Sequence, residues 1–443
     1  MAFSGLDIYK LLPKTNCREC GFATCLAFAM QLAKKNVPID KCPSISAEAK
    51  AILESAALPP IKLITIGSGE NKLDLGNETV MFRHEEKFRS PCGLGIIIDD
   101  TSNDREIKEK IGKINQLKFE RVGQVLEVNC LALKHSGGQG RFESAVKLLL
   151  ENTSLPLVFM NNEPKSLESA CEIAKDKRPL IYCATKDNLA VFAGIAGRFN
   201  LPLVVSDADL EKMQDLVSEL KNRGLSDLVL DTGRKNIADK LWDLTQIRRQ
   251  ALKKSNRLLG FPSLAIAENA DPYEEAMQAC AYIAKYAGIV LISGISSWET
   301  LSILTLRQNI YTDPQKPLQI EPKLYTVGSA GRESPVLVTT NFSLSYYTVL
   351  GEVEASKIPS YILSVDTEGM SVLTAWAAEK FNAETITLSL NKSGVKDIVN
   401  HKRVIIPGYV AVMSGDLQEQ SGFNIIVGPK EAAGLPTFLK NLN

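Results

Sequence analysis

The chain has 443 residues, 45% of them hydrophobic and 23% charged, and its 51 basic residues equal its 51 acidic ones. At about 150 residues per domain, this composition predicts a globular protein of roughly three domains. Because nucleic acids and anionic membranes attract a basic surplus, the zero net charge argues against both as partners. No apolar signal core opens the chain and no stretch nears the roughly 18 apolar residues of a membrane span, so we expect a cytoplasmic protein.

Residues 1–57 form a short, cysteine-rich segment with a helical pattern. Cys17, Cys20, Cys25 and Cys42 are spaced C-x2-C-x4-C-x16-C, and a proline follows the last. Three thiolates within nine residues suit a loop around a cuboidal cluster. The C-x2-C and C-x4-C spacings share their middle cysteine, an arrangement that is common in iron-sulfur proteins. Zinc sites more often show two separate cysteine pairs. The spacing therefore predicts a 4Fe-4S cluster bound by these four cysteines, with zinc as the alternative.

The remaining five cysteines are scattered and sit mostly in apolar segments, where cysteine behaves as a small hydrophobe. We expect them in the protein core rather than at a site. They are Cys92, Cys130, Cys171, Cys183 and Cys280.

Residues 58–320 alternate β-branched runs with amphipathic stretches. About eight strand-helix repeats over roughly 260 residues match a TIM (β/α)8 barrel, while a doubly wound open sheet remains the competing fold. Asp207 and Asp231 follow strands, where barrel enzymes carry catalytic groups, but no cluster of acid, base and nucleophile accompanies them. We interpret both as N-caps and the barrel as a scaffold. The predicted strands are 95–100, 124–128, 157–160, 180–183, 201–206, 227–231, 263–267 and 289–293.

A proline-rich stretch, residues 312–328, is typical of a linker. Residues 325–443 then resume the alternation on a smaller scale, with a helix predicted at 369–381. Five strand-helix units indicate a Rossmann-like or flavodoxin-like domain, whose ligands bind outside the carboxyl ends of the strands. The predicted strands of this domain are 336–341, 361–366, 384–390, 403–408 and 424–429.

Four segments carry a family resemblance that covers the whole chain in the same domain order. They are LDIYKLLPKTNCRECGFATCLAFAMQLAKK near the start and, near the end, SVDTEGMSVLTAWAAEKF, VIIPGYVAVMSGDLQEQSG and VGPKEAAGLPTFLK. The chain resembles the large (gamma) subunit of corrinoid iron-sulfur proteins, which serve the acetyl-CoA synthase / CO dehydrogenase system. The resemblance implies an N-terminal 4Fe-4S domain, a central TIM barrel and a C-terminal corrinoid-binding (cobalamin-binding) domain.

The function that the resemblance implies is methyl transfer. Cobalt as Co(I) accepts a methyl group from methyltetrahydrofolate on a separate methyltransferase and donates it to acetyl-CoA synthase, and the cluster returns oxidised Co(II) to Co(I). Such a chain is a carrier rather than a stand-alone enzyme. The implied partners are a small corrinoid-protein subunit in a heterodimer, the methyltransferase, acetyl-CoA synthase / CO dehydrogenase and a reductive activator.

The corrinoid is expected over the small, hydroxyl-rich strand ends of the last domain. A common cobalamin signature, DxHxxG, supplies histidine as the lower cobalt ligand, but the aspartate-to-glycine segment 366–369 contains no histidine. We therefore expect a base-off corrinoid without a protein histidine ligand. The candidate contacts are Thr340, Tyr346, Met370, Ser371, Val372, Leu373, Thr374, Gly408 and Ala433.

Two other functions stay open at this point. The chain could be an iron-sulfur electron-transfer subunit of a flavin oxidoreductase, with flavin in the last domain, although no G-x-G-x-x-G follows a strand and no phosphate-binding G-x4-G-K-[ST] occurs. It could also be a methyltransferase whose barrel binds a pterin. The sequence leaves the choice between folate and another pterin donor open.

Overall fold

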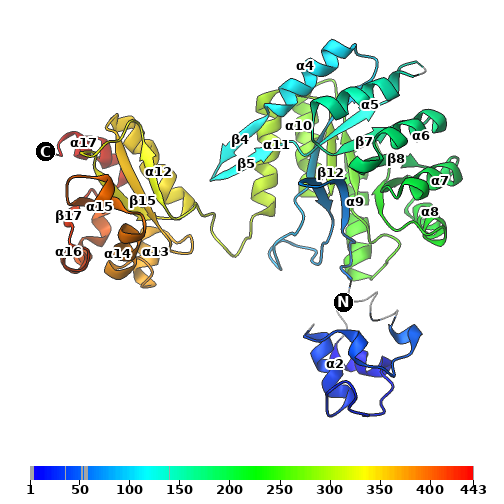
Figure 1. The fold of residues 1–443 in the computed structure, drawn as a ribbon, viewed down its shortest axis with the longest axis horizontal. Coiled ribbons are helices and arrows are strands. Elements are labelled where there is room, and N and C mark those ends of the chain that lie inside the picture. The colour runs from blue at the N-terminus through cyan, green and yellow to red at the C-terminus, as the bar shows by residue number, and fades with distance from the viewer. Residues whose placement is uncertain (1–3, 35, 51–52, 54–57, 139, 443) are drawn as a thin grey trace. The chain divides into compact units, whose positions relative to one another are not determined.

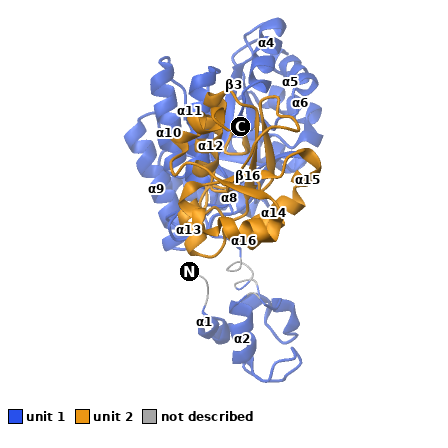
Figure 2. Ribbon diagram, turned by 90° about the vertical axis from the view of Figure 1, so that its left-hand side faces the viewer, with its two compact units in different colours: residues 1–119, 126–311 blue, residues 120–125, 312–443 orange. Residues whose placement is uncertain are grey.

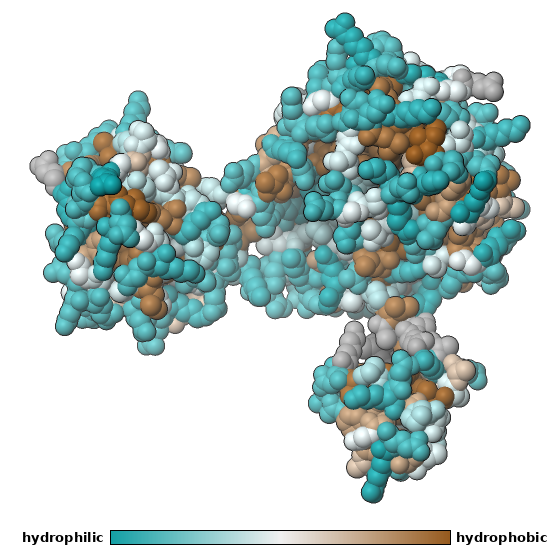
Figure 3. Space-filling model, viewed as in Figure 1, coloured by the Kyte–Doolittle hydropathy of each residue, from teal (hydrophilic) through white to brown (hydrophobic). Residues whose placement is uncertain are grey.

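The computed structural model describes residues 4–34, 36–50, 53, 58–138 and 140–442. It divides into two compact units, one of residues 1–119 and 126–311 and one of residues 120–125 and 312–443 (Figures 1 and 2). The expected boundary at residue 57 lies outside the described residues. No described helix is both long and apolar enough to cross a membrane. On the face drawn in Figure 3, hydrophobic patches are small and are surrounded by hydrophilic surface.

The cysteine-rich segment folds around two short helices, α1 (Gly5–Leu11) and α2 (Cys25–Ala33), followed by the 3-10 turn η1 (Ile39–Lys41). Ser4 and Asp7 form a reciprocal capping box that starts α1. Thr24 caps α2 by accepting a hydrogen bond from the Ala27 N–H at 3.1 Å. The two helices pack closely enough that a Cβ at Gly5 would lie 2.4 Å from the Met30 sulfur. A small core of its own holds the segment together: Ile8, Leu12, Cys25, Phe28, Ala29, Cys42 and Leu53.

A closed parallel barrel forms the centre of the first unit. The sheet order is β10-β9-β8-β7-β6-β3-β12-β11. The Leu230 N–H donates to the Pro262 carbonyl at 2.9 Å, and the bridge between Leu230 and Ser263 joins the first strand of this order to the last. This closure decides for the (β/α)8 barrel and against the open sheet. The strands are β3 (Gly93–Asp99), β6 (Cys130–Lys134), β7 (Leu157–Met160), β8 (Leu180–Ala184), β9 (Leu203–Ser206), β10 (Leu228–Asp231), β11 (Leu264–Ala267) and β12 (Ile289–Ile292).

One helix follows each barrel strand, as the fold requires. In chain order they are α4 (Asp104–Asn115), α5 (Arg141–Asn152), α6 (Pro164–Ile173), α7 (Leu189–Phe199), α8 (Leu210–Asn222), α9 (Ile237–Lys253), α10 (Pro272–Ala284) and α11 (Ser297–Tyr311), with the 3-10 turn η2 (Lys175–Lys177) after α6.

One predicted barrel strand, 124–128, was wrong. Gln124–Glu127 forms β5, which pairs only with β4 (Lys118–Arg121) in a two-stranded sheet, and the barrel strand is β6. A barrel strand is covered on both faces and needs a continuous apolar run, which CLALK supplies with four buried residues. The first two residues of β5 are exposed. A second hairpin that the sequence did not predict, β1 (Ile64–Ser68) with β2 (Asn71–Leu75), packs at the amino ends of the barrel strands, where the Gly67 N–H donates to the Arg178 carbonyl.

The second unit is a five-stranded mixed sheet in the order β13-β15-β14-β16-β17. Four strands run parallel and the edge strand β13 runs antiparallel to β15. Numbered in chain order, the four parallel strands lie in the sheet in the order 2-1-3-4. After β14 the chain adds β15 on one side and then β16 and β17 on the other side, so the strand order reverses between β14 and β16. The strands are β13 (Leu324–Val327), β14 (Val336–Thr340), β15 (Ser360–Val365), β16 (Arg403–Ile406) and β17 (Asn424–Val427).

Helices cover both faces of this sheet, and the sheet separates two small cores (Figure 1). They are α12 (Ser343–Ser356), α13 (Val372–Ala377), α14 (Ala383–Lys392), α15 (Val395–Ile398), α16 (Ser414–Ser421) and α17 (Leu435–Lys440), with the 3-10 turns η3 (Gly408–Met413) and η4 (Ala432–Gly434).

Three predictions for this unit need correction. Residues 384–390 are not a strand but part of α14, whose buried Ala383, Ile386 and Leu390 follow the helical period and whose start carries a capping box at Asn382. The threonines of ETITLSL had suggested a β-strand at this place. The linker 312–328 is shorter than predicted, because its last residues form β13. The predicted helix 369–381 is only α13, since Gly369 and Glu379 adopt positive φ angles of 75° and 57°.

Candidate cluster loop and sheet-edge site

The loop between α1 and α2 carries two of the four candidate cluster ligands, Cys17 and Cys20, and Cys25 begins α2 directly after it. Its backbone winds tightly, with positive φ at Lys14, Asn16, Arg18 and Gly21. Backbone that alternates right-handed and left-handed residues forms concave surfaces that bind anions, including iron-sulfur clusters. The Asn16 side chain fixes the far end of the loop by accepting a hydrogen bond from the Cys25 N–H at 2.8 Å.

The four thiols differ in exposure. Cys17 is exposed, Cys20 half-buried, and Cys25 and Cys42 buried. Burial raises the pKa of Cys42, and the charges of Cys20, Cys25 and Cys17 raise it further, so all four groups are electrostatically coupled. Within the described part of the chain, no three Cys, His, Asp or Glu side chains stand at metal-binding geometry. The donor set nevertheless fits a cubane cluster in kind and number. Of the other cysteines, Cys280 is half-buried and the remaining four are buried, as predicted.

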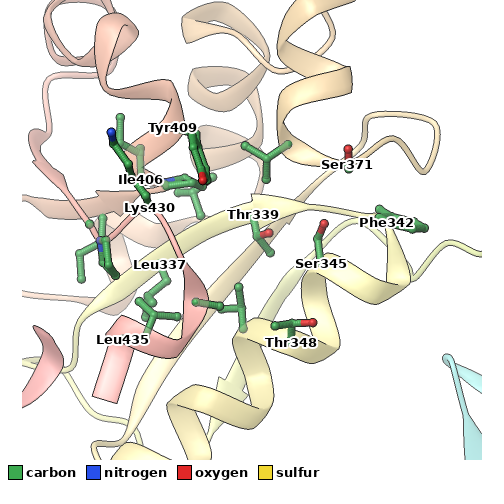
Figure 4. A pocket seen from close by; sticks show the side chains of 18 of the residues that line it. Leu337, Thr339, Phe342, Ser345, Thr348, Ser371, Ile406, Tyr409, Lys430 and Leu435 are labelled. Carbon is green, nitrogen blue, oxygen red and sulfur yellow. The ribbon is translucent and has the colours of Figure 1, made fainter. Parts of the chain in front are cut away.

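A second candidate site lies at the carboxyl edge of the mixed sheet. Open α/β sheets bind ligands where the strand order reverses, which here is between β14 and β16. A cavity of about 310 Å³ opens at this place. Figure 4 shows Thr339 on the central strand, Ser345 and Thr348 along α12, and Ser371 above them. This cavity volume lies at the lower end of the range for small-molecule pockets.

The cavity is lined by apolar side chains and by several hydroxyl groups. Leu337, Ile405, Ile406 and Leu435 supply apolar surface. Thr339, Ser345, Thr348 and Ser371 supply hydroxyls, and Lys430 supplies a cation. Close by, the fully buried Thr340 hydroxyl finds no hydrogen-bond partner among the described residues. The cavity therefore suits a largely apolar group that carries a few hydrogen-bonding atoms.

The structure brings only part of the predicted contact set to this cavity. Ser371 and Val372 line it. Gly408 lies between the lining residues Pro407 and Tyr409, and a Cβ there would come within 2.6 Å of the Gly428 carbonyl oxygen, so only glycine lets the two loops meet. The flanking positions outside the cavity lining are Thr340, Met370, Leu373, Thr374 and Ala433.

Tyr346 is placed differently from the other predicted contacts. It is a buried residue of α12 itself. The centre of its ring lies 4.7 Å from that of Tyr325, and it does not line the cavity. Its chain neighbour Ser345 does. Sequence reasoning also missed Phe342, Thr348, Tyr409 and Lys430. The spacing of 342, 345 and 348 repeats every three residues and could have identified one face of α12.

The only histidine in the second unit, His401, lies at the opposite edge of the sheet. It precedes β16, and its Nε2 atom is 2.8 Å from the Ser334 carbonyl, which precedes β14. Because parallel strands share their amino edge, His401 lies at the end of the sheet opposite to the strand ends that carry Thr340 and Pro407.

The barrel aspartates are not N-caps, so that prediction was wrong. Asp209 caps α8 and Asn236 caps α9. Asp231 is buried and pairs with Lys240, and the Tyr182 hydroxyl donates to it at 2.7 Å. Asp207 accepts a hydrogen bond from the Asp209 N–H. Both aspartates bind neighbouring protein groups.

Two buried acids, Glu275 and Glu299, lie at the carboxyl end of β12. Glu275 accepts hydrogen bonds from the Ser293 and Gly294 N–H groups at 2.9 and 2.8 Å. Burial and the adjacent Glu275 raise the pKa of Glu299 to about 7 from an ordinary 4.5. Between pH 4.5 and about 7, the Glu299 carboxyl group therefore keeps a proton in the folded state that it loses in the unfolded state.

We expect Glu299 to lower stability as pH rises from 4.5 to 7. Its contribution is complete below pH 4.5 and is lost as the pH passes through the folded pKa. Urea unfolding at pH 5 and pH 7.5 measures the difference. Glu299→Gln should reduce it, whereas the exposed neighbour substitution Glu274→Gln should not. An equal pH difference in Glu299→Gln and the unaltered chain would contradict the assignment.

These features define a class of protein, in which an iron-sulfur module, a (β/α)8 barrel and an open-sheet domain share one chain. A family model described as "Putative Fe-S cluster" matches residues 12–44. Another, described as "CO dehydrogenase/acetyl-CoA synthase delta subunit", matches residues 63–439. The dihydropteroate synthase of Thermus thermophilus is similar over 56% of this chain and 100% of its own, at 12% identity and a TM-score of 0.39. The barrel assignment itself rests on the strand order of the sheet.

Full-length relatives identify the family. The corrinoid/iron-sulfur protein large subunit of Moorella thermoacetica is 43% identical over 441 residues, which cover 99% of both chains. The acetyl-CoA decarbonylase/synthase complex subunit gamma of Methanothermobacter thermautotrophicus is 34% identical over 100% of this chain and 99% of that one. The chain belongs to the family of corrinoid/iron-sulfur protein large subunits and acetyl-CoA decarbonylase/synthase gamma subunits.

Proposed function

We propose that this chain carries a corrinoid and a 4Fe-4S cluster and works as the methyl-carrying large subunit of an acetyl-CoA synthase system. The observation that carries the proposal is that one chain of this family combines the four-cysteine segment with a cavity at the reversal point of an open sheet. A bound corrinoid would supply cobalt for taking up and releasing a methyl group, and the cluster would supply single electrons. The proposal retains three domains, residues 1–57, 58–320 and 325–443.

In this proposal Cys17, Cys20, Cys25 and Cys42 bind the cluster. Cys25 is the first residue of α2, and the N-terminus of a helix favours a negatively charged group such as the cluster. The negative cluster would also benefit from the left-handed loop backbone around Asn16 and Arg18. Exposed Cys17 places one ligand at the surface, where an electron donor or acceptor has access.

The corrinoid would lie against the carboxyl edge of the sheet. A whole macrocycle exceeds the roughly 310 Å³ cavity, so the cavity would take one of its side groups while the ring rests on the rim. Exposed apolar side chains at that edge, Leu373, Tyr409 and Val412, offer a surface for a flat ring. The candidate contacts named from the sequence remain proposals alongside Ser345, Thr348 and Lys430.

We further propose that the corrinoid is held base-off, without a histidine ligand from this chain. His401 lies at the opposite edge of the sheet, and His84 and His135 belong to the other unit. The surface over the cavity thus offers hydroxyl and apolar groups rather than a strong cobalt ligand. A cobalt centre with no strong lower donor is more easily reduced to four-coordinate Co(I), which is the state that accepts a methyl group.

The proposed partners are those of the family function. They are a small corrinoid-protein subunit, a methyltetrahydrofolate-dependent methyltransferase, acetyl-CoA synthase / CO dehydrogenase and a reductive activator. The second candidate, an electron-transfer subunit with flavin at the sheet edge, draws on the general preference of such folds for ligands at this position.

Metal analysis of the anaerobically purified chain, co-expressed with its small subunit, tests the proposal. We expect about four irons and one cobalt per chain, the content of one cubane and one corrinoid, with a corrinoid visible spectrum. Iron with flavin absorption and no cobalt would favour the electron-transfer function. Zinc in place of iron would refute the assignment of the cysteines.

A further inference from the structure

A single buried amide at the end of β14 organises the loop beside the proposed corrinoid site. Asn341 is 1% exposed. Its Oδ1 atom accepts hydrogen bonds from the Thr367 N–H, the Thr367 hydroxyl and the Gly369 N–H, each at 3.0 Å. These bonds hold the turn between β15 and α13, which leads directly to the cavity residues Ser371 and Val372.

The turn depends on this amide because its own conformation is unfavourable. Glu368 and Gly369 both have positive φ, 54° and 75°, and a non-glycine residue in that region carries a conformational cost. Inside the turn, the Thr367 hydroxyl is 3.1 Å from the Met370 carbonyl, and the Met370 N–H donates to the Thr367 carbonyl at 3.2 Å. Without the Asn341 acceptor, the Thr367 and Gly369 N–H groups would lose their partner.

The other end of the same amide reaches the linker. The Asn341 Nδ2 group donates to Gln319 Oε1 at 3.3 Å and to Asp366 Oδ1 at 3.2 Å. Gln319 is exposed and lies in the segment that enters this unit from the barrel. Backbone bonds fix that segment to the same strand end, from the Ile320 N–H to the Asn341 carbonyl at 3.0 Å and from the Ser343 N–H to the Leu318 carbonyl at 2.9 Å.

Gln319 also contacts the turn directly by packing. A Cβ at Gly369 would lie 2.5 Å from the Gln319 Cγ atom, so linker and turn are in van der Waals contact across the amide. The linker end, the strand end and the turn therefore share one hydrogen-bond network, in which the buried Asn341 is the common member and Gln319 and Asp366 are exposed.

We propose that Asn341 is a positioning residue that couples the linker end to the corrinoid-binding turn. The conformational order of residues 366–371 then depends on whether residues 318–320 are bound to the end of β14. This inference rests on the proposed corrinoid site and names a regulation of it. When the linker end is seated, the turn presents Ser371 and Val372 to the cavity. When residues 318–320 move away, the Asn341 amide that holds the turn loses its hydrogen bond to Gln319, and the affinity for the corrinoid falls.

A matched pair of substitutions at exposed Gln319 separates coupling from folding. Gln319→Met keeps the side-chain length and removes the acceptor, whereas Gln319→Glu keeps an acceptor for Asn341. Gln315→Ala, also exposed and in the same linker, is the control. Asn341→Ala removes the whole relay. Two measurements on the full chain apply: amide hydrogen exchange at Thr367 and Gly369 without corrinoid, and titration with hydroxocobalamin.

We expect Gln319→Met to speed exchange at these two amides and to weaken hydroxocobalamin binding, each about threefold to tenfold, the effect of one net hydrogen bond. Asn341→Ala should exceed tenfold in both, while Gln319→Glu and Gln315→Ala should match the unaltered chain. Unchanged exchange in Gln319→Met would overturn the coupling whatever Asn341→Ala shows, because Asn341→Ala removes the acceptor of these two N–H groups directly. If the unaltered chain bound no hydroxocobalamin, the proposed function would fail, and hydrogen exchange alone would still decide the coupling.

Discussion

Replacing Cys25 by alanine should remove the cluster while leaving the rest of the protein folded. Cys25 is buried at the start of α2 and contributes one of the four thiols. A cubane needs four ligands, and the substitution leaves three protein thiolates. We expect iron to fall from about four per chain to less than one.

The consequence for function should be selective. Reductive reactivation from Co(II) should slow by more than the roughly 10–100-fold that outer-shell substitutions cost at metal sites. Corrinoid content should not change, because the proposed corrinoid site belongs to the other unit. Iron analysis, electron paramagnetic resonance and the Co(II) absorption band measure these effects. Cys280→Ser is the matched control, since this half-buried thiol lies on α10. Four irons retained in Cys25→Ala would remove Cys25 from the ligand set.

Filling the sheet-edge cavity should abolish corrinoid binding. Ser345 lies on the cavity-facing side of α12, and tryptophan at this position would occupy much of the roughly 310 Å³ (Figure 4). Because the position is only half-buried and borders an open cavity, the fold should tolerate the larger side chain better than a packed core would. We expect the hydroxocobalamin dissociation constant to rise at least about 100-fold, which corresponds to about 2.7 kcal/mol.

The control for this substitution lies on the same helix. Glu354→Trp places the same side chain on an exposed position of α12 outside the cavity and should leave binding unchanged. Thermal unfolding of both variants shows whether the domain stays folded. Cobalt content after purification gives an independent measure, and iron should stay near four per chain in both. Equal corrinoid binding by Ser345→Trp and the unaltered chain would move the corrinoid away from this cavity.

Local patterns were enough for the features that depend on neighbouring residues in the chain. The C-x2-C-x4-C-x16-C spacing marks the segment that the iron-sulfur family model matches. Apolar runs such as 157–160 and 289–293 predicted barrel strands, because a strand covered on both faces must be apolar throughout. The four segments that resemble corrinoid iron-sulfur proteins predicted the family that full-length relatives establish.

Only the tertiary structure showed that the predicted strand 124–128 forms a hairpin and that a neighbouring run, which the sequence analysis did not predict, joins the barrel. Pairing across the sheet placed 130–134, not 124–128, between β3 and β7. Packing also made 384–390 a helix, because Ile386 and Leu390 face one core.

The sequence by itself determined the cysteine spacing, the family and most of the strands, but not the states of 124–128 and 384–390. The order β15-β14-β16-β17, which puts the reversal point and its cavity between β14 and β16, follows from contacts between residues far apart in the chain. The same contacts turn Ser345 into the cavity and Tyr346 onto Tyr325, since adjacent helical residues point about 100° apart. Asn341 joins the linker to the turn for the same reason, because its partners lie 22 to 28 positions away.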